Sequence, residues 1–262
     1  RMLRYKRINE HFFMDTFFAT KKAGKSSRGN NCMQLFVTDK GYVYVVAMKS
    51  NGDVPLALKV FAKEIGAPDA IICDAAGEQT SHELKRFCQQ MGTTLRVLEE
   101  GTPWANRAEL YIGLIKEAVR KDMKDSDCPL AFWDYCAERR SRINNLTARN
   151  LFQLDGRNAE FSVTGEEGDI SNLCQFGWYT WCYFRDGKSP FPYPKEILGR
   201  VLGPAKGEGN EIAQWILKAN GKIVPRRTVR PLNAIEISSE TEIKKRSIFD
   251  QLIEKRWGSS VN

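Results

Sequence analysis

The sequence predicts an α/β domain with a mixed sheet, followed by a small domain built from short β-strands. In residues 8–150, apolar runs of strand length alternate with stretches of helical periodicity. In residues 172–235, short β runs are separated by turn signals instead. The length of 262 residues and the 42% share of hydrophobic residues suffice for one substantial core and a smaller second unit.

The first predicted strand covers residues 11–19 and is apolar on both sides of Asp15, as in a central strand covered on both faces. Two β runs within residues 32–49 are joined by a hairpin turn at Asp39-Lys40-Gly41. Helices and strands then alternate: a helix at about 54–66, a strand at 70–73, a helix from a capping box that begins at Thr80, a strand at 94–98, and helices at about 105–124 and 129–148. The result is a five-stranded mixed sheet flanked by helices, which ends near residue 150.

The remainder of the chain has a different organisation. Residues 151–171 are polar and contain glycine, so we expect a linker. Four or five short strands in residues 172–235 predict a small closed barrel, with Asn220-Gly221 as a hairpin turn. Residues 236–262 have apolar residues at helical spacing, and we expect a tail or a linker that docks only in a longer protein.

Charge and cysteine usage narrow the functional class. The net charge of +8 favours a polyanionic partner such as nucleic acid, and most of it lies from residue 172 onward. The seven cysteines form no CxxC pair, which argues against a disulfide framework or a zinc ribbon and favours a reducing, intracellular compartment. No apolar run approaches the length of a membrane span, so we expect no membrane role.

Three acidic residues lie in three different local contexts. Asp15 lies in the first strand, Asp74 ends the run AIICD, and Glu109 opens the helix that follows GTPWANRAE. Carboxylates from separate elements that converge on one point are what a pair of divalent cations requires. The sequence therefore predicts a metal site of the nuclease or strand-transfer kind at Asp15, Asp74 and Glu109, with Mg²⁺ or Mn²⁺ as the cofactor and two ions expected.

Each acid taken alone also has a plainer explanation. Asp15 can lie at an exposed strand end, Asp74 can start a turn, and acids are common in the first turn of any helix. The helix of Glu109 supports the functional interpretation, because Lys116 and Arg120 lie within about 20° of Glu109 on the same side. This stripe would present two cations to a phosphodiester backbone beside the metals, although a solvated helix face is the alternative.

At this point the sequence resembles a known family. The segments MDTFF, ICDAAGEQTSHELKRFCQQMGTTLRVL and TPWANRAE are similar to motifs of the integrases of long-terminal-repeat retrotransposons, especially the copia type, over about residues 8–235. The resemblance implies an RNase H-like core with a D, D, E triad, followed by a small SH3-like barrel. The family has 35 residues between its last two acids, whereas 34 lie between Asp74 and Glu109, and we place the missing residue in the loop before the helix.

The resemblance also assigns roles to individual residues. Asp15, Asp74 and Glu109 match the metal-binding triad, which makes them the expected catalytic residues. Lys116 matches a position that touches element DNA, and Asn106 matches a loop residue near the DNA end. Two further positions are less specific: Trp104 can stack on a base but fits a core position slightly better, and Glu78 has at most a supporting or capping contact.

The predicted barrel carries a second group of basic residues. Arg226, Arg227 and Arg230 alternate with Thr228 and Val229 on a predicted β run, so these arginines can meet a phosphate backbone from one surface. A solvated charged face is an equally frequent interpretation of such a run. Together with Asn106, Lys116 and Arg120, these arginines form the predicted DNA-binding set.

The expected function is that of a metal-dependent polynucleotidyl transferase, an integrase encoded within a Pol polyprotein, which processes element DNA 3′ ends and joins them to target DNA. Its expected partners are double-stranded DNA and further copies of the chain. The resemblance implies an intracellular location, in the nucleus and in a cytoplasmic particle. Two alternatives remain: a catalytically inactive or domesticated DNA-binding remnant, and an RNase H-like nuclease or DDE transposase.

Overall fold

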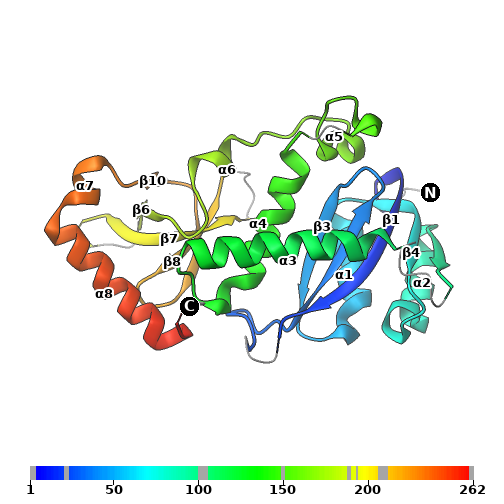
Figure 1. Cartoon of the computed structure of the whole chain (residues 1–262), viewed down its shortest axis with the longest axis horizontal. Helices are drawn as coiled ribbons and strands as arrows, with labels where there is room; N and C mark the ends of the chain where they lie inside the picture. The colour runs from blue at the N-terminus through cyan, green and yellow to red at the C-terminus, as the bar shows by residue number, and fades with distance from the viewer. Residues whose placement is uncertain are drawn as a thin grey trace. The chain divides into compact units, whose positions relative to one another are not determined.

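The computed structural model describes residues 4–20, 24–99, 106–148, 151–187, 190–192, 194–205 and 212–259. The chain divides into two compact units (Figure 1). The N-terminal unit comprises residues 1–118 and 140–169, and the C-terminal unit comprises residues 119–139 and 170–262.

A mixed five-stranded sheet forms the centre of the N-terminal unit, with strand order β3-β2-β1-β4-β5. Its strands are β1 (Arg7–Phe18), β2 (Cys32–Thr38), β3 (Val43–Met48), β4 (Ala67–Cys73) and β5 (Thr94–Val97). Strand β1 pairs antiparallel with β2 and parallel with β4, which makes the sheet mixed. The predicted α/β class and the five-stranded mixed sheet are therefore confirmed.

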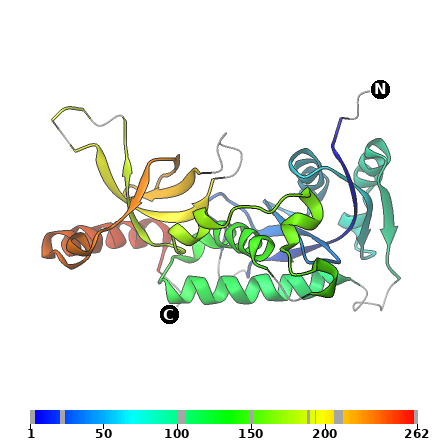
Figure 2. The same cartoon turned by 90° about the horizontal axis from the view of Figure 1, so that it is seen from above.

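Helices cover both faces of this sheet. They are α1 (Val54–Glu64), α2 (His82–Met91), α5 (Ala159–Thr164) and the parts of α3 (Arg107–Asp125) and α4 (Trp133–Leu146) that belong to this unit, with 3₁₀ turns at Asn51–Asp53, Gly77–Thr80 and Phe152–Leu154. A further 3₁₀ turn, Leu130–Phe132, belongs to the C-terminal unit. Figure 2 shows α1 and α2 on one side of the sheet and α3 along the other. The predicted capping box at Thr80 is wrong by one residue: Ser81 is the N-cap of α2, and its side chain accepts a hydrogen bond from the Leu84 N–H.

An aromatic cluster lies between α1 and the sheet. Phe61 of α1 is fully buried and contacts Phe12 of β1, Phe36 of β2 and Tyr44 of β3, with ring centroids 4.9, 4.6 and 5.6 Å from its own. Aromatic side chains bury large apolar areas, so this cluster contributes strongly to the stability of the unit. It also fixes the position of β1, the strand that carries Asp15.

The C-terminal unit contains a second five-stranded sheet, antiparallel throughout, with strand order β10-β6-β7-β8-β9. Its strands are β6 (Trp181–Arg185), β7 (Glu196–Pro204), β8 (Gln214–Lys218), β9 (Ile223–Arg226) and β10 (Val229–Pro231), accompanied by α6 (Ser171–Gln175), α7 (Ala234–Ser238) and α8 (Glu240–Trp257). Gly221 has φ +75°, which suits the hairpin turn predicted between β8 and β9.

The observed division of the chain differs from the expected one in two places. Residues 151–171, expected as a linker, contain α5, whose Ala159 is fully buried in the core of the N-terminal unit. Residues 236–262, expected as a tail, contain most of α7 and all of α8. The α8 residues Phe249 and Ile253 are buried within the C-terminal unit. In both segments, apolar side chains pack into the core of the unit to which they belong.

Candidate active site

Two of the predicted metal ligands lie on neighbouring parallel strands. Asp15 is on β1, and Asp74 directly follows β4. The parallel register pairs Phe13 with Ile72, and extending it by two residues brings Asp74 level with Asp15. Adjacent strands lie about 4.8 Å apart, so the sheet itself places these two carboxylates side by side.

The third acid lies on a helix. Glu109 is in the first turn of α3, and its N–H donates to the Asn106 carbonyl. Asn106 links this turn to Asp74: its side-chain amide donates to the Asp74 carboxylate at 3.1 Å, and its side-chain oxygen accepts from the Ala108 N–H at 3.0 Å. With only 3% of its surface exposed, Asn106 holds Asp74 and α3 together rather than presenting its amide to solvent.

Electrostatics also indicates that the three acids are close. The pKa of Asp15 is raised to about 6, mainly because burial disfavours its charged form, and further because the negative charges of Asp74 and Glu109 act on it. The hydrogen bond from the Thr16 N–H and the charge of Lys116 lower this pKa and only partly offset the rise. Three acids from two strands and a helix therefore share one electrostatic site.

The donor set fits a hard divalent cation in its chemistry. Carboxylate oxygens are the ligands that Mg²⁺ and Mn²⁺ prefer. A cation would offset the burial, and also the smaller repulsion by Asp74 and Glu109, that raise the pKa of Asp15. Within the described ranges, however, no three His, Cys, Asp or Glu side chains are close enough to hold an ion together. The three acids are thus electrostatically coupled without forming a complete ligand set.

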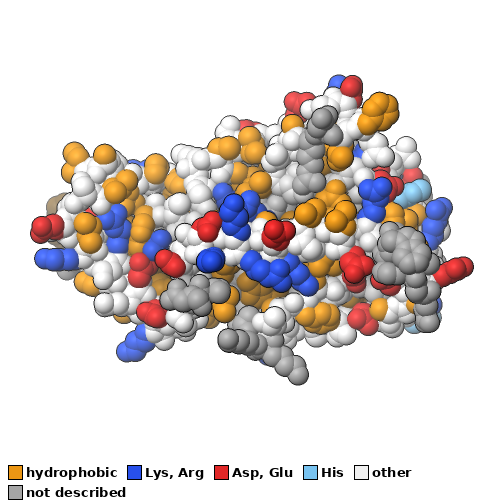
Figure 3. All heavy atoms as spheres, viewed as in Figure 1, with side chains coloured by type: hydrophobic (Ala, Val, Ile, Leu, Met, Phe, Trp, Pro, Cys, Tyr) orange, Lys and Arg blue, Asp and Glu red, His pale blue; other side chains and the backbone are white. Residues whose placement is uncertain are grey.

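The basic stripe consists of Lys116 and Arg120, and both residues lie within α3. Lys116 is half-buried, with its ammonium 5.5 Å from the centre of the Phe17 ring on β1, and its charge acts on Asp15. Arg120, one turn further along the same helix, is exposed. Figure 3 shows Lys and Arg side chains gathered along α3 on the face seen in Figure 1. Of these two residues, Lys116 is thus the one whose charge is shown to act on Asp15.

A buried polar network beside the acids was missed by the sequence reasoning. The Gln79 amide donates to the Thr16 hydroxyl at 2.8 Å, and the Thr16 hydroxyl donates to the Gln34 side chain at 2.6 Å. Gln79 and Gln34 are 1% and 0% exposed. Because Gln79 follows Asp74 by five residues and Thr16 follows Asp15 directly, the network fastens the segment after Asp74 to the strand of Asp15. Single glutamines in a sequence give no periodic signal that could reveal it.

Replacing Gln79 by Met is expected to destabilise the N-terminal unit by about 1–3 kcal/mol, because the Thr16 and Gln34 side chains lose a buried partner. The matched control is Gln89→Met on the exposed side of α2, which should change stability by less than about 0.5 kcal/mol. Amide hydrogen exchange of β1 and β4 measures both effects locally. Equal protection in the two variants would show that the network is not a stabilising contact.

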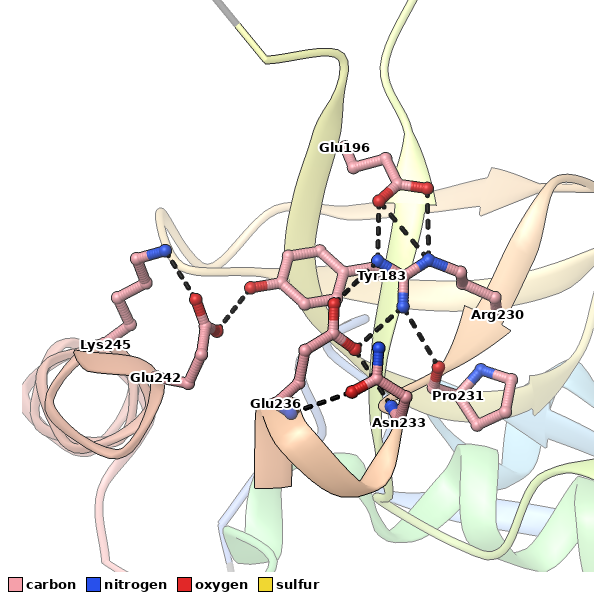
Figure 4. Close-up of polar contacts among 8 residues, drawn as sticks. All are labelled: Tyr183, Glu196, Arg230, Pro231, Asn233, Glu236, Glu242 and Lys245. Atoms are coloured by element: carbon pink, nitrogen blue, oxygen red, sulfur yellow. Dashed lines mark hydrogen bonds and ion pairs between the residues drawn. The ribbon is translucent and has the colours of Figure 1, made fainter. Parts of the chain in front are cut away.

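The predicted arginine surface of the barrel is arranged differently from expectation. The run is not one strand, because β9 ends at Arg226 and β10 begins at Val229, with a bend between them. Arg226 lies 3.9 Å from the Asp186 carboxylate, and Arg227 is exposed. Arg230 forms ion pairs with Glu196 at 2.6 Å and Glu236 at 2.8 Å (Figure 4). The three side chains therefore do not form one uncompensated row, since Arg230 is held by two carboxylates.

The ion pair between Arg230 and Glu236 should make the stability of the C-terminal unit depend on pH. The Arg230 guanidinium, and then the Asn233 N–H, lower the pKa of Glu236 from 4.5 to about 2. A lowered folded-state pKa contributes stability that is present above pH 4.5 and is lost as the pH falls toward 2. Glu236→Gln should therefore cost about 1 kcal/mol at pH 7, after allowance for solvent screening, and almost nothing near pH 2.

Tryptophan fluorescence during urea unfolding is the measurement, because five of the six tryptophans lie in the C-terminal unit. Glu240→Gln, at an exposed position of α8, is the control and should leave the pH dependence unchanged. If Glu236→Gln lowers the free energy of unfolding by the same amount at pH 7 and at pH 2, the ion pair does not contribute as described.

Two further positions complete the sequence-derived set. Trp104 lies outside the described residues, as do all of residues 100–105. Glu78 is half-buried in the 3₁₀ turn Gly77–Thr80, between Asp74 and Gln79. Its place in this turn is consistent with a supporting position near the site.

Comparisons with known proteins bear on the fold. No protein-family model and no curated protein match this sequence. A chain from the simian T-cell lymphotropic virus intasome, solved by cryo-EM in complex with PP2A regulatory subunit B56 gamma, has a TM-score of 0.50 and 15% identity. The match covers 89% of this chain and 84% of that one. Two structures of the HTLV-2 integrase catalytic core domain in complex with magnesium, one trimeric and one dimeric, have TM-scores of 0.47 and 0.45. Each has 19% identity and covers 61% of this chain and 99% of its own.

At 15% identity, the match to the intasome chain is evidence for the fold alone. The N-terminal unit, a mixed five-stranded sheet flanked by helices, has the architecture of an integrase catalytic core, and the second antiparallel sheet is consistent with a C-terminal β domain.

Proposed function

We propose that this chain is the catalytic core and C-terminal domain of a retrotransposon integrase of the copia type, part of a Pol polyprotein. In this proposal it is a metal-dependent polynucleotidyl transferase of the DDE kind, which processes element DNA 3′ ends and joins them to target DNA. The motifs around Asp15, Asp74 and Glu109 support the family, and the integrase-type fold supports the reaction class.

The observation that carries the proposal is the electrostatic coupling of three acids from separate elements. Asp15 lies amid Phe12, Phe13 and Phe17, where an ionised carboxylate is costly without a compensating charge. The nearby Asp74 and Glu109 make this cost larger and contribute to the raised pKa of Asp15. A carboxylate such as Asp15, whose ionisation is disfavoured by burial and by neighbouring negative charges, is typical of a functional site rather than of a structural one.

The proposed reaction is an in-line phosphoryl transfer. The 3′-hydroxyl oxygen of element DNA forms a bond to a phosphorus atom of the target strand. The bond from that phosphorus to the target 3′-oxygen breaks, and the proton of the attacking hydroxyl leaves to solvent. Asp15, Asp74 and Glu109 would hold two Mg²⁺ or Mn²⁺ ions, which supply Lewis-acid stabilisation of the attacking and leaving oxygens.

The surrounding residues have positioning roles in this proposal. Asn106 orients the Asp74 carboxylate, and the Gln79 network fixes the segment that follows Asp74. Lys116 and Arg120 would contact the phosphates of element DNA along α3. Arg226 and Arg227 remain proposed DNA contacts of the C-terminal unit. Arg230 would join them only by giving up its carboxylate partners.

The proposal includes the partners and the cellular location. The chain would act on double-stranded DNA as a homo-oligomer in the nucleus, after assembly in a cytoplasmic particle. Among the described helices, none is both long and apolar enough to cross a membrane.

A second candidate function is favoured by one observation. The three acids do not form a complete ligand set within the described residues. This would fit a domesticated DNA-binding remnant without catalysis. An RNase H-like nuclease or a DDE transposase would use the same acids but give different products.

Joining of a labelled short duplex to plasmid DNA at low salt, with and without Mg²⁺ or Mn²⁺, tests the proposal. We expect metal-dependent transfer of the label to the plasmid. Cleavage without joining would replace the integrase proposal with the nuclease. DNA binding without either reaction would favour the remnant.

A further inference from the structure

A charged cavity lies in the N-terminal unit, away from the three acids. It has a volume of about 570 Å³ and is formed by the residues just before β1, the end of α1 and one side of α2. Figure 2 shows the start of the chain running between α1 and α2. We call this cavity the basic pocket. Its lining is mainly cationic and aromatic: Arg4, Lys6, Lys59, Lys63, Tyr5 and Phe87.

The positive charge of the basic pocket is largely uncompensated. Glu64 is the one acid in the lining, so it offsets at most one of the four positive charges there; its carboxylate also accepts a hydrogen bond from the Tyr44 hydroxyl. Lys59 pairs with the exposed Glu83 at 2.8 Å. Within the described part of the chain, Arg4, Lys6 and Lys63 have no carboxylate within ion-pair distance. The pocket therefore presents three cations that an anion could neutralise.

The walls of the basic pocket are built by specific contacts. The Ala67 N–H donates to the Lys6 carbonyl at 2.7 Å, which fastens the start of the chain to the turn after α1. Gly66 in this turn has φ +134°, and a Cβ there would lie 2.4 Å from the Lys6 oxygen. Only glycine permits this approach. The backbone of Lys6 is thus part of a fixed wall rather than of a free terminus.

Aromatic rings hold two of the pocket's cations in place. The Tyr5 and Phe87 rings meet edge to face at 6.1 Å. The Arg4 guanidinium lies 5.7 Å from the centre of the Tyr5 ring, and the Lys59 ammonium lies 5.8 Å from that of Phe87. Cations over ring faces are attracted by the ring quadrupole, so these charges are held near the cavity before any ligand arrives.

The basic pocket and the acidic site lie at opposite ends of the same strands. Because β1 and β4 are parallel, their carboxyl ends lie together and carry Asp15 and Asp74. The pocket lies at their amino ends, beside Gly66. The seven residues of β4 separate the two ends by about 20 Å. A phosphate bound in the pocket therefore belongs to a different part of a nucleic acid from one bound at the acids.

We propose that the basic pocket binds phosphate groups of a DNA backbone, as a second contact separate from the acidic site. Flexible lysine and arginine side chains around an open cavity can contact phosphates. Among its described residues, the cavity contains no helix or strand that could enter a DNA groove and contact the bases, so the contact is independent of DNA sequence. The net charge of +8 favours DNA over a basic or neutral partner. This contact requires DNA binding only, so it does not depend on the proposed transferase activity.

Lysine acetylation with and without a saturating random-sequence duplex tests this inference, in EDTA so that no joining occurs. We expect DNA to protect Lys6 and Lys63 at least severalfold, as read by mass spectrometry. Polyglutamate serves as the second anion. Protection by polyglutamate but not by DNA would overturn the proposal in favour of an acidic protein partner. Unchanged acetylation with both anions would overturn it as well.

A variant pair provides the independent measurement. The pocket variant combines Arg4→Gln, Lys6→Gln and Lys63→Gln. Its control combines Lys49→Gln, Lys244→Gln and Lys255→Gln, three exposed positions with the same change in net charge. In the pocket variant only, the slope of log K against log salt should fall by about 0.9 for each DNA phosphate that is no longer neutralised. Equal slopes in the two variants, both with wild-type melting temperatures, would contradict the proposal. This experiment measures DNA binding and not joining, so its result does not depend on whether the chain is catalytically active.

Discussion

Replacing Asp74 by Asn is expected to abolish DNA joining while leaving the fold unchanged. Asn has the shape of Asp and keeps a side-chain oxygen that can accept the hydrogen bond from the Asn106 amide. It loses the negative charge that a divalent cation requires. Loss of one preorganised electrostatic group in an active site costs about 10²–10³-fold in rate, and loss of a metal ligand should cost at least as much.

The matched control is Asp69→Asn on the same strand. Asp69 is exposed and pairs with Arg7 on the surface, so its replacement should leave joining within about twofold and stability within about 1 kcal/mol. Joining rates in Mg²⁺ and far-UV circular dichroism of both variants complete the test. Wild-type joining by Asp74→Asn would remove Asp74 from the catalytic set and with it the proposed mechanism.

Replacing Phe61 by Ala is expected to cost about 3–5 kcal/mol in the free energy of unfolding of the N-terminal unit. Phe61 is fully buried and packs against rings from three strands, so its removal leaves a cavity that the sheet cannot fill. The same change should also reduce joining, because Phe12 and Asp15 lie on one strand and lose the support of α1.

Leu56→Ala is the control on the same helix, where the side chain is 60% exposed and the expected cost is below about 0.5 kcal/mol. Two units need not unfold together, so hydrogen exchange of β1 and β2 is preferable to a single melting temperature. Similar exchange rates in the two variants would show that the aromatic cluster does not carry the stability of this unit.

Much of the N-terminal unit could be predicted because its signals are local. Apolar runs, the hairpin turn near Gly41 and the helical periodicity after residue 105 give the order of strands and helices. Parallel pairing of β1 and β4 then brings Asp15 and Asp74 together without further information. The segment that leads to Glu109 lies outside the described ranges, and the charge of Glu109 contributes to the raised pKa of Asp15.

Other features could not be predicted because periodicity does not identify the partner of an apolar face. Residues 119–139 continue the predicted helices but pack with the C-terminal unit, where Met123 and Phe132 are buried. The ion pairs of Arg230 could not be predicted for a related reason, since the sequence shows a charge but not the carboxylate that neutralises it. Arg230 is paired with Glu196, which lies 34 residues away.

Binding of Mn²⁺ to the wild-type chain and to Asp15→Asn, followed by electron paramagnetic resonance, tests the central claim most directly. The claim is that Asp15, Asp74 and Glu109 jointly hold a divalent cation. We expect saturable binding to the wild type that is weakened at least tenfold in Asp15→Asn and similarly in Glu109→Gln. Equal binding by all three proteins, or none by the folded wild type with DNA present, would contradict the account.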